Sequence, residues 1–275
     1  MFPYKYPIAW FFHRSTIHTE WEPETSVELV FVKPDLGYTE PGAMKRYSSA
    51  TQVHLPYPEP LTTPIGVALA ERASCRRFAP QPLTTKQISI LLKAAYGVSG
   101  ETSAGDTSTR ERPVPSAGGR YPLEIYLLLW NVESVRSGIY HYEPLQHALE
   151  YLDTVPPRTR IPSLFLNQPY LGEAGALVVL TGVPDRQLDR YRDRGYRYLL
   201  IEGGHVAQNI GLVAAAVGVG CLSLGGFMDD SVAALLDLQQ DCEIALYGIA
   251  LGTRATPDRV EGRGLNAMPT HSQEP

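Results

Sequence analysis

The sequence predicts an α+β fold in which a central, mostly antiparallel sheet is flanked by helices. Short apolar runs separated by turn residues are typical of successive antiparallel strands. Such runs occupy residues 123–130, 138–142 and 149–152. Two more apolar runs, residues 176–181 and 244–251, predict further buried strands. A long helix is expected between Arg190 and Val217.

A shorter helix is expected to begin at Thr84 or Thr85, whose hydroxyls can cap its first turn, and to end at Gly97. Its apolar face is formed by Ile88, Leu91, Leu92, Ala95 and Tyr96. Residues 99–112 have almost no apolar content, so they predict a mobile loop that could act as a lid.

The long helix is unusual because Gly203, Gly204 and Gly211 lie in its interior. Each glycine costs about 1 kcal/mol in helix propensity relative to alanine. Close packing of another element against the helix would explain that cost.

The composition indicates a globular protein. With 275 residues and 44% hydrophobic content, the chain can bury a large core, and its formal net charge of −5 argues against a nucleic acid or an anionic membrane as a general partner. Its three cysteines, Cys75, Cys221 and Cys242, are widely spaced and indicate a reducing compartment. We find neither a membrane-spanning run nor a signal-peptide pattern, so a cytoplasmic protein is expected.

Three regions are expected along the chain. Residues 1–60 are rich in proline and aromatic residues and predict an extended arm with a strand at Val27–Val32. Residues 61–254 contain the predicted sheet and helices and form the expected domain. Residues 255–275 predict a polar tail.

The most informative motif is the small-residue loop Pro115–Pro122, which leads directly into the strand at residue 123. Its two adjacent glycines allow the backbone to approach a flat ligand, and its N–H groups can point toward that ligand. Taken alone, the loop more often marks a tight turn before a strand.

A cluster of arginines gives a second signal. Arg72, Arg76 and Arg77 surround the hydroxyl of Ser74, and Arg254 follows the last predicted strand. Guanidinium groups suit phosphate oxygens. The alternative interpretation is a solvated basic helix end.

These segments together resemble the nitroreductase superfamily. The segments 72–78, 115–124, 202–209 and 252–254 occur in that family's order, and they look most like its SagB-type branch of flavin-dependent dehydrogenases. Phe12–Thr16 and Met44–Tyr47 resemble pieces of the family's lead-in segment. The resemblance implies a nitroreductase-like fold and an intertwined homodimer whose two sites are each built from both subunits, with the long helix in the core.

The resemblance also implies a bound FMN, which is favoured over FAD because no separate adenosine site is apparent. The arginine motif and Arg254 match phosphate, ribityl or pyrimidine contacts, and the glycine loop matches a contact along the flavin. The implied cofactor-binding residues are Arg72, Ser74, Arg76, Pro115, Ser116, Ala117, Gly118, Gly119, Gln208, Asn209, Leu224, Gly225, Gly226 and Arg254. The polar loop at 99–112 would then lie beside the cofactor.

The peptide-dehydrogenase branch places a Lys-Tyr pair just before the long helix, and Arg190–Tyr191 stands at that position here. Arginine does not lose its proton at workable pH, so Arg190 cannot act as a base. Either Tyr191 serves alone, with Arg190 favouring its ionised form, or the substrate differs. The alternative interpretation is that Arg190 and Tyr191 are two surface residues at the start of a helix, with no catalytic role.

Two other features carry less weight. His205 is a candidate acid or base, and the alternative is a hydrogen-bonded core histidine. Gly218–Gly226 looks like a dinucleotide-binding loop, but it follows a helix and its third glycine is displaced, so it is not a Rossmann fingerprint. No metal site is indicated.

The implied function is an oxidoreductase that dehydrogenates a thiazoline or oxazoline ring in a peptide, with dioxygen reoxidising the flavin. A separate recognition protein or a carrier would then deliver the substrate. Two alternatives stay open. The chain could be a nicotinamide-dependent reductase of small electrophiles such as nitro compounds or quinones, or a non-catalytic partner in a peptide-modifying assembly.

Overall fold

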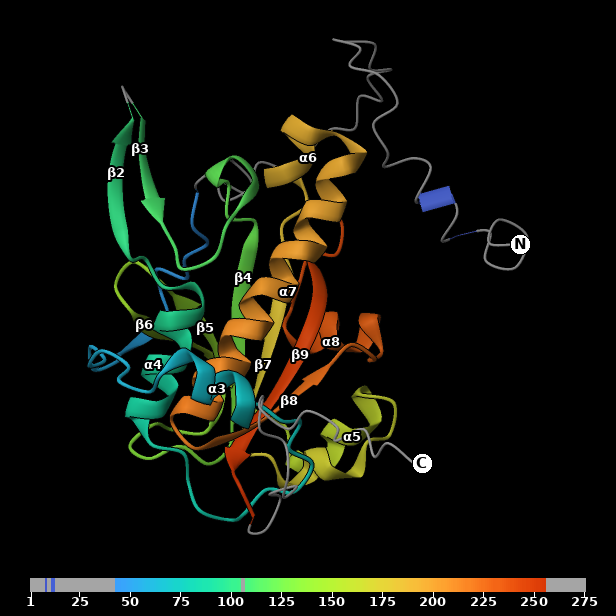
Figure 1. Ribbon diagram of the computed structural model, residues 1–275. Coiled ribbons are helices and arrows are strands. Elements are labelled where there is room, and N and C mark those ends of the chain that lie inside the picture. The colour runs from blue at the N-terminus through green and yellow to red at the C-terminus, as the bar shows by residue number, and fades with distance from the viewer. Residues whose placement is uncertain (1–7, 9–10, 13–42, 105–106, 256–275) are drawn as a thin grey trace, which may run out of the picture.

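A seven-stranded antiparallel sheet forms the centre of the molecule (Figure 1). The computed structural model describes residues 8, 11–12, 43–104 and 107–255. Across the sheet, the strands stand in the order β1 (Thr51–His54), β6 (Ala148–Asp153), β5 (Gly138–Glu143), β4 (Leu123–Leu129), β7 (Ala176–Gly182), β9 (Ile244–Thr253) and β8 (Val219–Leu224). Each neighbouring pair is antiparallel, which confirms the predicted sheet and the five strands expected within it.

The central strand β4 is buried along its whole length. Its pairing with β7 runs from Leu123 opposite Gly182 to Leu129 opposite Ala176. Ile125 and Leu127 belong to the core on one face of the sheet, whereas Tyr126 and Leu128 belong to the core on the other. Apart from Glu124, the strand is therefore a continuous apolar run, because both of its faces are covered.

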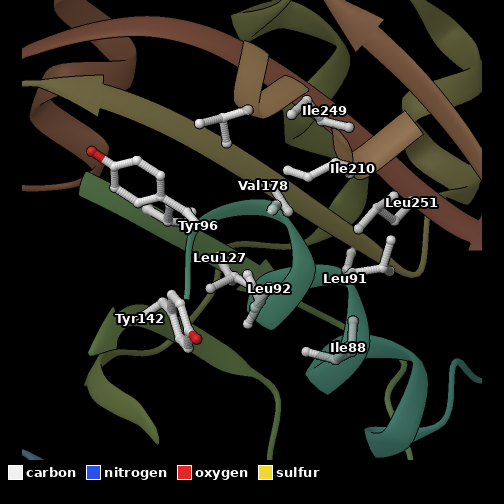
Figure 2. Packing of buried hydrophobic residues seen from close by; sticks show 14 of the residues in the cluster. Ile88, Leu91, Leu92, Tyr96, Leu127, Tyr142, Val178, Ile210, Ile249 and Leu251 are labelled. Carbon is white, nitrogen blue, oxygen red and sulfur yellow. The ribbon is translucent and has the colours of Figure 1, made fainter. Parts of the chain in front are cut away.

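Helices α4 (Thr85–Tyr96) and α7 (Asp193–Ala216) cover the first face, and α3 (Ile65–Glu71) packs against α7 (Figure 1). Figure 2 shows Leu92 of α4 and Ile210 of α7 among the side chains that meet Leu127 and Val178 of the sheet. The second face is covered by α5 (Ile161–Leu164), α8 (Asp229–Leu235) and two short 3-10 turns, Arg158–Arg160 and Pro169–Glu173.

Helix α4 forms as the sequence predicts. The Thr84 hydroxyl oxygen accepts the N–H of Gln87 over 3.1 Å, and Gln87 Oε1 accepts the N–H of Thr84 over 2.9 Å, so the two residues form a capping box. Gly97 ends the helix with an extended φ of −67°. Glycine is needed there because a Cβ would lie 2.8 Å from the Lys93 carbonyl oxygen.

The long helix predicted between Arg190 and Val217 is α7, and a short helix, α6 (Asp185–Tyr191), precedes it. Helix α6 ends at Arg192, whose φ of 50° and ψ of −146° break the helix before α7 begins. Arg190 and Tyr191 therefore close a preceding helix. The break has a packing cause, because a Cβ at Gly195 of α7 would lie 2.9 Å from the Gln187 carbonyl oxygen of α6, so the two helices meet closely there.

The prediction of a mobile loop at residues 99–112 is wrong. This segment forms a hairpin of β2 (Gly100–Ala104) and β3 (Thr107–Glu111), which extends away from the main sheet (Figure 1). Its base is closed by a hydrogen bond from the Ser99 N–H to the Glu111 carbonyl oxygen over 2.8 Å. A cross-strand backbone ladder needs no apolar face, and β-branched threonines favour the extended backbone.

The segment before β1 is fastened to the second face by a buried lysine. Lys45 donates through Nζ to Glu243 Oε2 over 2.6 Å and to the Tyr126 hydroxyl over 2.7 Å. Thr181 completes the environment of Glu243 with a hydrogen bond of 2.6 Å. Part of the region expected as an arm thus contributes a sheet strand and a core ion pair. The strand expected at Val27–Val32 lies outside the described residues.

None of the helices within the described part of the chain is long and apolar enough to cross a membrane. The three cysteines are buried and form no disulfide.

Candidate functional site

The glycine loop ends in a 3-10 turn, η1 (Ala117–Gly119), directly before β4. Gly118 and Gly119 have φ angles of 67° and 64°, a left-handed backbone that glycine adopts at little cost. The Ser116 hydroxyl oxygen accepts the N–H of Tyr121 over 2.9 Å. The loop is therefore a defined turn, and its Gly118 surface is exposed.

Tyr191 at the end of α6 reaches this loop. Its hydroxyl lies 2.8 Å from the position that a Cβ on Gly118 would take. The ring packs edge-on against Tyr198 of α7 at 5.1 Å between centroids. The exposed Arg190 places its guanidinium 5.7 Å from the centre of the Tyr191 ring. The structure thus brings Tyr191 and Arg190, predicted as catalytic, beside the predicted cofactor loop.

Helix α6 is held against the loop by Arg186, which is 1% exposed. Arg186 donates to Glu124 Oε1 over 2.6 Å and to the Tyr121 carbonyl oxygen over 3.2 Å. In return, Arg120 Nε donates to the Arg186 carbonyl oxygen. These bonds join α6 to both sides of the turn that carries the glycines.

Glu124 belongs to a buried charge network on the second face of the sheet. His141 contacts Glu150 through Nδ1 at 2.8 Å and Glu124 through Nε2 at 3.1 Å. Burial works to lower the pKa of His141, but the two carboxylates outweigh it and raise that pKa. Burial works to raise the pKa of Glu124, but Arg186 and His141 lower it to about 2. Glu124 is therefore an anion that orients Arg186.

The two arginines predicted to hold a phosphate converge on the junction of α7 and β8. The side chain of Arg72 lies 3.7 Å from the Cβ position of Gly211, and Arg254 Cγ lies 3.2 Å from that of Gly220. Burial raises the pKa of the Cys221 thiol to about 12, while both guanidinium groups work to lower it, so both charges act at one point. Within the described chain, the buried Nε of Arg254 has no hydrogen-bond partner.

Ser74 and Arg76 of the same motif are exposed. The backbone of Ser74 pairs with Cys221 as an isolated parallel bridge, and the Cys75 N–H donates to the Cys221 carbonyl oxygen over 2.9 Å. Phe78 forms a similar bridge with Arg254. The backbone of the arginine motif therefore runs beside β8 and the end of β9, and the side chains of Ser74 and Arg76 are exposed.

The loop and the arginines lie at different places along α7. Glu202 stands beside the loop, since it contacts Ser116, and Gly211 stands beside Arg72. Nine residues separate Glu202 from Gly211, which at 1.5 Å per residue is roughly 13 Å of helix axis. Within one chain, the glycine loop and the arginines are therefore separated along α7.

One face of α7 is open between them. Gly204, His205 and Gln208 are exposed, and Asn209 is half-buried. Leu200 and Ile201 on the same helix are 42% and 50% exposed. No described atom lies within 4 Å of a Cβ built on Gly203 or Gly204, so the expected close packing is absent among the described residues. His205 is therefore exposed within the single chain.

The third group of predicted contacts, Leu224, Gly225 and Gly226, follows β8. Leu224 is buried, whereas Gly225 is exposed and lies near Tyr247. A Cβ on Gly226 would lie 2.6 Å from Leu166, which itself has a φ of 52°. As expected, this stretch is no dinucleotide loop, because its residues 219–224 form a strand.

Glu202 is a candidate functional residue that the sequence analysis did not single out. It is 2% exposed, and the Tyr96 hydroxyl donates to its Oε1 over 3.0 Å. Burial raises its pKa to about 7, while the hydroxyls of Ser116 and Tyr96 work to lower it. The signal was a carboxylate inside an apolar helix face, but its partner Tyr96 lies too far along the sequence to be inferred from spacing.

Comparison with known proteins agrees with the fold. Residues 69–253 match the family model described as the nitroreductase family. The antiparallel sheet with its flanking helices is therefore that of a nitroreductase-type protein. The chain belongs to the nitroreductase family.

Its relatives include two proteins named for the processing of microcin B17 and of trifolitoxin. The microcin B17-processing protein McbC of Escherichia coli is 36% identical over 163 residues, which cover 58% of each chain. The trifolitoxin-processing protein TfxB of Rhizobium leguminosarum bv. trifolii is 26% identical over 61% of this chain and 46% of its own length. The chain thus spans about half the length of these two relatives. A Methanocaldococcus jannaschii protein described as a nitroreductase, MJ1384, is 34% identical over 62% of this chain and 83% of its own.

Solved structures show the same fold. A chain of the E. coli microcin synthetase McbBCD complex with truncated pro-MccB17 bound has a TM-score of 0.57 and 25% identity, covering 90% of this chain and 82% of its own. A Ralstonia eutropha protein described as a nitroreductase has a TM-score of 0.63 and 26% identity, covering 79% and 95%. In the described part of this chain, no group of His, Cys, Asp or Glu residues is arranged to hold a metal ion.

Proposed function

We propose that the protein is an FMN-dependent oxidoreductase that dehydrogenates a ring in a peptide-derived substrate. The observation that supports this most strongly is Tyr191, whose hydroxyl lies over Gly118 of the proposed cofactor loop. That geometry puts an acid–base group at the place where a flat ligand would rest. Similarity to McbC and TfxB, both named as processing proteins, points to a peptide as the substrate class.

The residues present fit a flavin mononucleotide. Arg72 and Arg254 form a cationic pair, and Arg254 still has a buried N–H to donate, so this end suits a phosphate dianion. Ser74 and Arg76 stand exposed beside it. The 115–119 loop has no side chain at Gly118 and Gly119 and can lie against a planar ring. Bound FMN supplies the acceptor for the hydride that leaves the substrate ring.

We further propose a homodimer in which the loop of one copy and the arginines of another form one site. The exposed apolar surface at Leu200 and Ile201, next to two glycines with open space around them, supports this arrangement. A second α7 packed there would also give a reason for the interior glycines.

Tyr191 is the proposed base for the substrate's acidic Cα proton. Its oxygen is at the loop surface, and the exposed Arg190 brings a positive charge beside its ring. Arg190 keeps its own proton, so its role is electrostatic. Leu224, Gly225, Gly226, Gln208 and Asn209 remain proposed cofactor neighbours, and the exposed His205 remains a proposed acid or base.

Incubation of the FMN-loaded protein with thiazoline- and oxazoline-containing peptides tests the function. The expected product lacks two hydrogens, detected by mass spectrometry. Tyr191→Phe should abolish that product, whereas Arg190→Lys should retain it, because a lysine also carries positive charge and can act as a base. A matched exposed change, Arg160→Ala, should leave turnover unchanged. Full turnover by the Tyr191→Phe protein would remove Tyr191 from the mechanism.

A second candidate is a nicotinamide-dependent reductase of nitro compounds or quinones. The 34% identity to a protein described as a nitroreductase favours it. Rapid bleaching of the yellow protein by NADPH, followed by recovery with a quinone, would support the reductase. Slow or absent bleaching, together with peptide oxidation, would support the dehydrogenase. A protein that stays colourless after FMN has been added and the unbound FMN removed would instead indicate a non-catalytic partner.

A further inference from the structure

Glu202 stands directly behind the glycine loop. It lies on α7 and is 2% exposed, and its Oε1 accepts the Tyr96 hydroxyl over 3.0 Å. The Tyr96 hydroxyl oxygen in turn accepts the N–H of Leu123, the first residue of β4. The carboxyl is thus fixed relative to the point where the loop enters the sheet.

The second oxygen of this carboxyl, Oε2, is buried and has spare hydrogen-bond capacity. The Ser116 hydroxyl stabilises the ionised carboxylate, although Oε2 has no partner of strict hydrogen-bond geometry among the described residues. Ser116 already accepts the N–H of Tyr121, so its oxygen is engaged and its proton is available to Glu202. An unsatisfied carboxylate oxygen in a buried place is costly. Protonation of the Glu202 carboxyl removes its negative charge and so reduces that cost.

Two cations, Arg112 and Arg186, act on Glu202. Arg112, just after β3, stacks on the Tyr96 ring at 4.1 Å from the ring centre and also favours the ionised carboxylate. Arg186 on α6 acts in the same direction, but its nearest partner is Glu124 at 2.6 Å. Burial outweighs these cations, so Glu202 is balanced between its acid and its anion near neutral pH.

We infer that Glu202 is a positioning residue of the cofactor loop, which takes up a proton when a planar ligand covers Ser116 and Gly118. The inference rests on the proposed binding of FMN at this loop. The carboxyl is already buried, so a ligand on the loop removes water from the half-buried Ser116 and the exposed Gly118 in front of it, and this loss of nearby solvent favours the neutral acid. The neutral acid can donate to Ser116, so the direction of the hydrogen bond reverses and the serine hydroxyl becomes free to donate to the ligand.

Calorimetric titration with FMN in buffers of different ionisation enthalpy measures this proton uptake. At pH 7 the wild-type protein should take up as much as about half a proton, since a group with a pKa about 7 is already half protonated there. Glu202→Gln should bind FMN and take up correspondingly less. The exposed change Glu133→Gln should behave as wild type. Riboflavin should give the same difference between wild type and Glu202→Gln, because the effect belongs to the ring and not to the phosphate.

Tyr96→Phe provides a second measurement if Glu202→Gln does not fold. Loss of the hydroxyl removes a donor to the carboxylate, so Glu202 should be more fully protonated before binding, and uptake at pH 7 should fall. Equal proton uptake by wild type, Glu202→Gln and Tyr96→Phe would overturn the inference while leaving the cofactor proposal intact. Failure of wild type to bind FMN or riboflavin would instead overturn the proposed function.

Discussion

The hydroxyl of Tyr191 lies over Gly118, 2.8 Å from the point where any side chain at that position would begin. The contact joins the last residue of α6 to the turn before β4, and Arg186 fixes it by holding α6 to Glu124 at 2.6 Å. An acid–base side chain and a bare backbone surface are therefore positioned by one rigid connection. This relationship makes the first prediction possible.

Gly118→Ala should displace Tyr191 and impair binding of FMN. A methyl group would collide with the hydroxyl, and the φ of 67° is strained for alanine by roughly 1–2 kcal/mol. The measurements are the free energy of unfolding by urea and the FMN dissociation constant. Gly172→Ala is the matched control, because no described atom lies within 4 Å of its Cβ position. Equal effects of both substitutions would contradict the assignment of the loop.

Arg254→Ala should weaken FMN binding without affecting riboflavin. A charge-assisted hydrogen bond is worth about 1.5–3 kcal/mol, which corresponds to a roughly 10- to 150-fold loss of affinity. Riboflavin lacks the phosphate, so its affinity should stay within about twofold. Fluorescence titration measures both ligands, with Arg160→Ala as an exposed control. A parallel loss of riboflavin affinity would place Arg254 elsewhere than at the phosphate.

Lys45→Met should destabilise the fold strongly, whereas Arg46→Met should not. Lys45 is buried and lies 2.6 Å from Glu243, whose side chain is fully buried, so its removal leaves an uncompensated carboxylate at a cost of about 3–5 kcal/mol. Arg46 has a side chain 44% exposed and contacts Glu143 at 3.4 Å, a pair worth less than about 1 kcal/mol. Denaturant unfolding measures both changes. The double variant Lys45→Met/Glu243→Gln should recover part of the lost stability. A double variant as unstable as Lys45→Met alone would argue against the ion pair between Lys45 and Glu243.

Glu202 should make the protein less stable as the pH rises. The carboxyl has a folded pKa of about 7 against an ordinary value of 4.5, so between these pH values the folded state binds more protons than the unfolded state. Stability from this group therefore falls as pH rises from 4.5 through 7, by about 3 kcal/mol at 1.36 kcal/mol for each pKa unit. Glu202→Gln should gain stability over wild type by up to that amount between pH 5 and pH 8. A difference between the two proteins that does not change with pH would contradict the shifted pKa.

Much of the fold could be predicted because its signals are local. The run at β4 and the capping box at Thr84 and Gln87 each lie within a few residues, so period and turn chemistry identify them. The order of the strands in the sheet was not predicted. Residue pattern alone does not fix which strands become neighbours.

The errors have physical causes that lie outside local pattern. The short helix α6 before the long helix was not predicted, because the break at Arg192 depends on close contact between Gly195 and the Gln187 backbone, and no glycine or proline marks the break itself. The hairpin at 100–111 forms through backbone pairing, which leaves no apolar periodicity to read. His205 looked like a core residue because α7 carries apolar side chains on several faces, and one of those faces is open in the single chain.

Individual residues of the candidate site were predicted, but most of the contacts between them were not. Arg72 and Arg254 were expected to meet, and both act on the same buried thiol. The burial of Glu202 against Tyr96 joins residues 106 positions apart, so no spacing rule could reveal it. Such partners become visible only when the tertiary structure places α4 beside α7.

A mixed dimer tests the central claim, a cofactor site formed by the loop of one copy and the arginines of another. Differently tagged Gly118→Ala and Arg254→Ala chains are co-expressed, and the heterodimer is purified and titrated at an FMN concentration that fills wild type but neither variant alone. If the site is shared, one of its two sites carries both changes and the other carries none, so the account predicts one FMN bound per heterodimer. If loop and arginines of a single chain form the site, each site carries one change, and a heterodimer that binds no FMN would contradict the account.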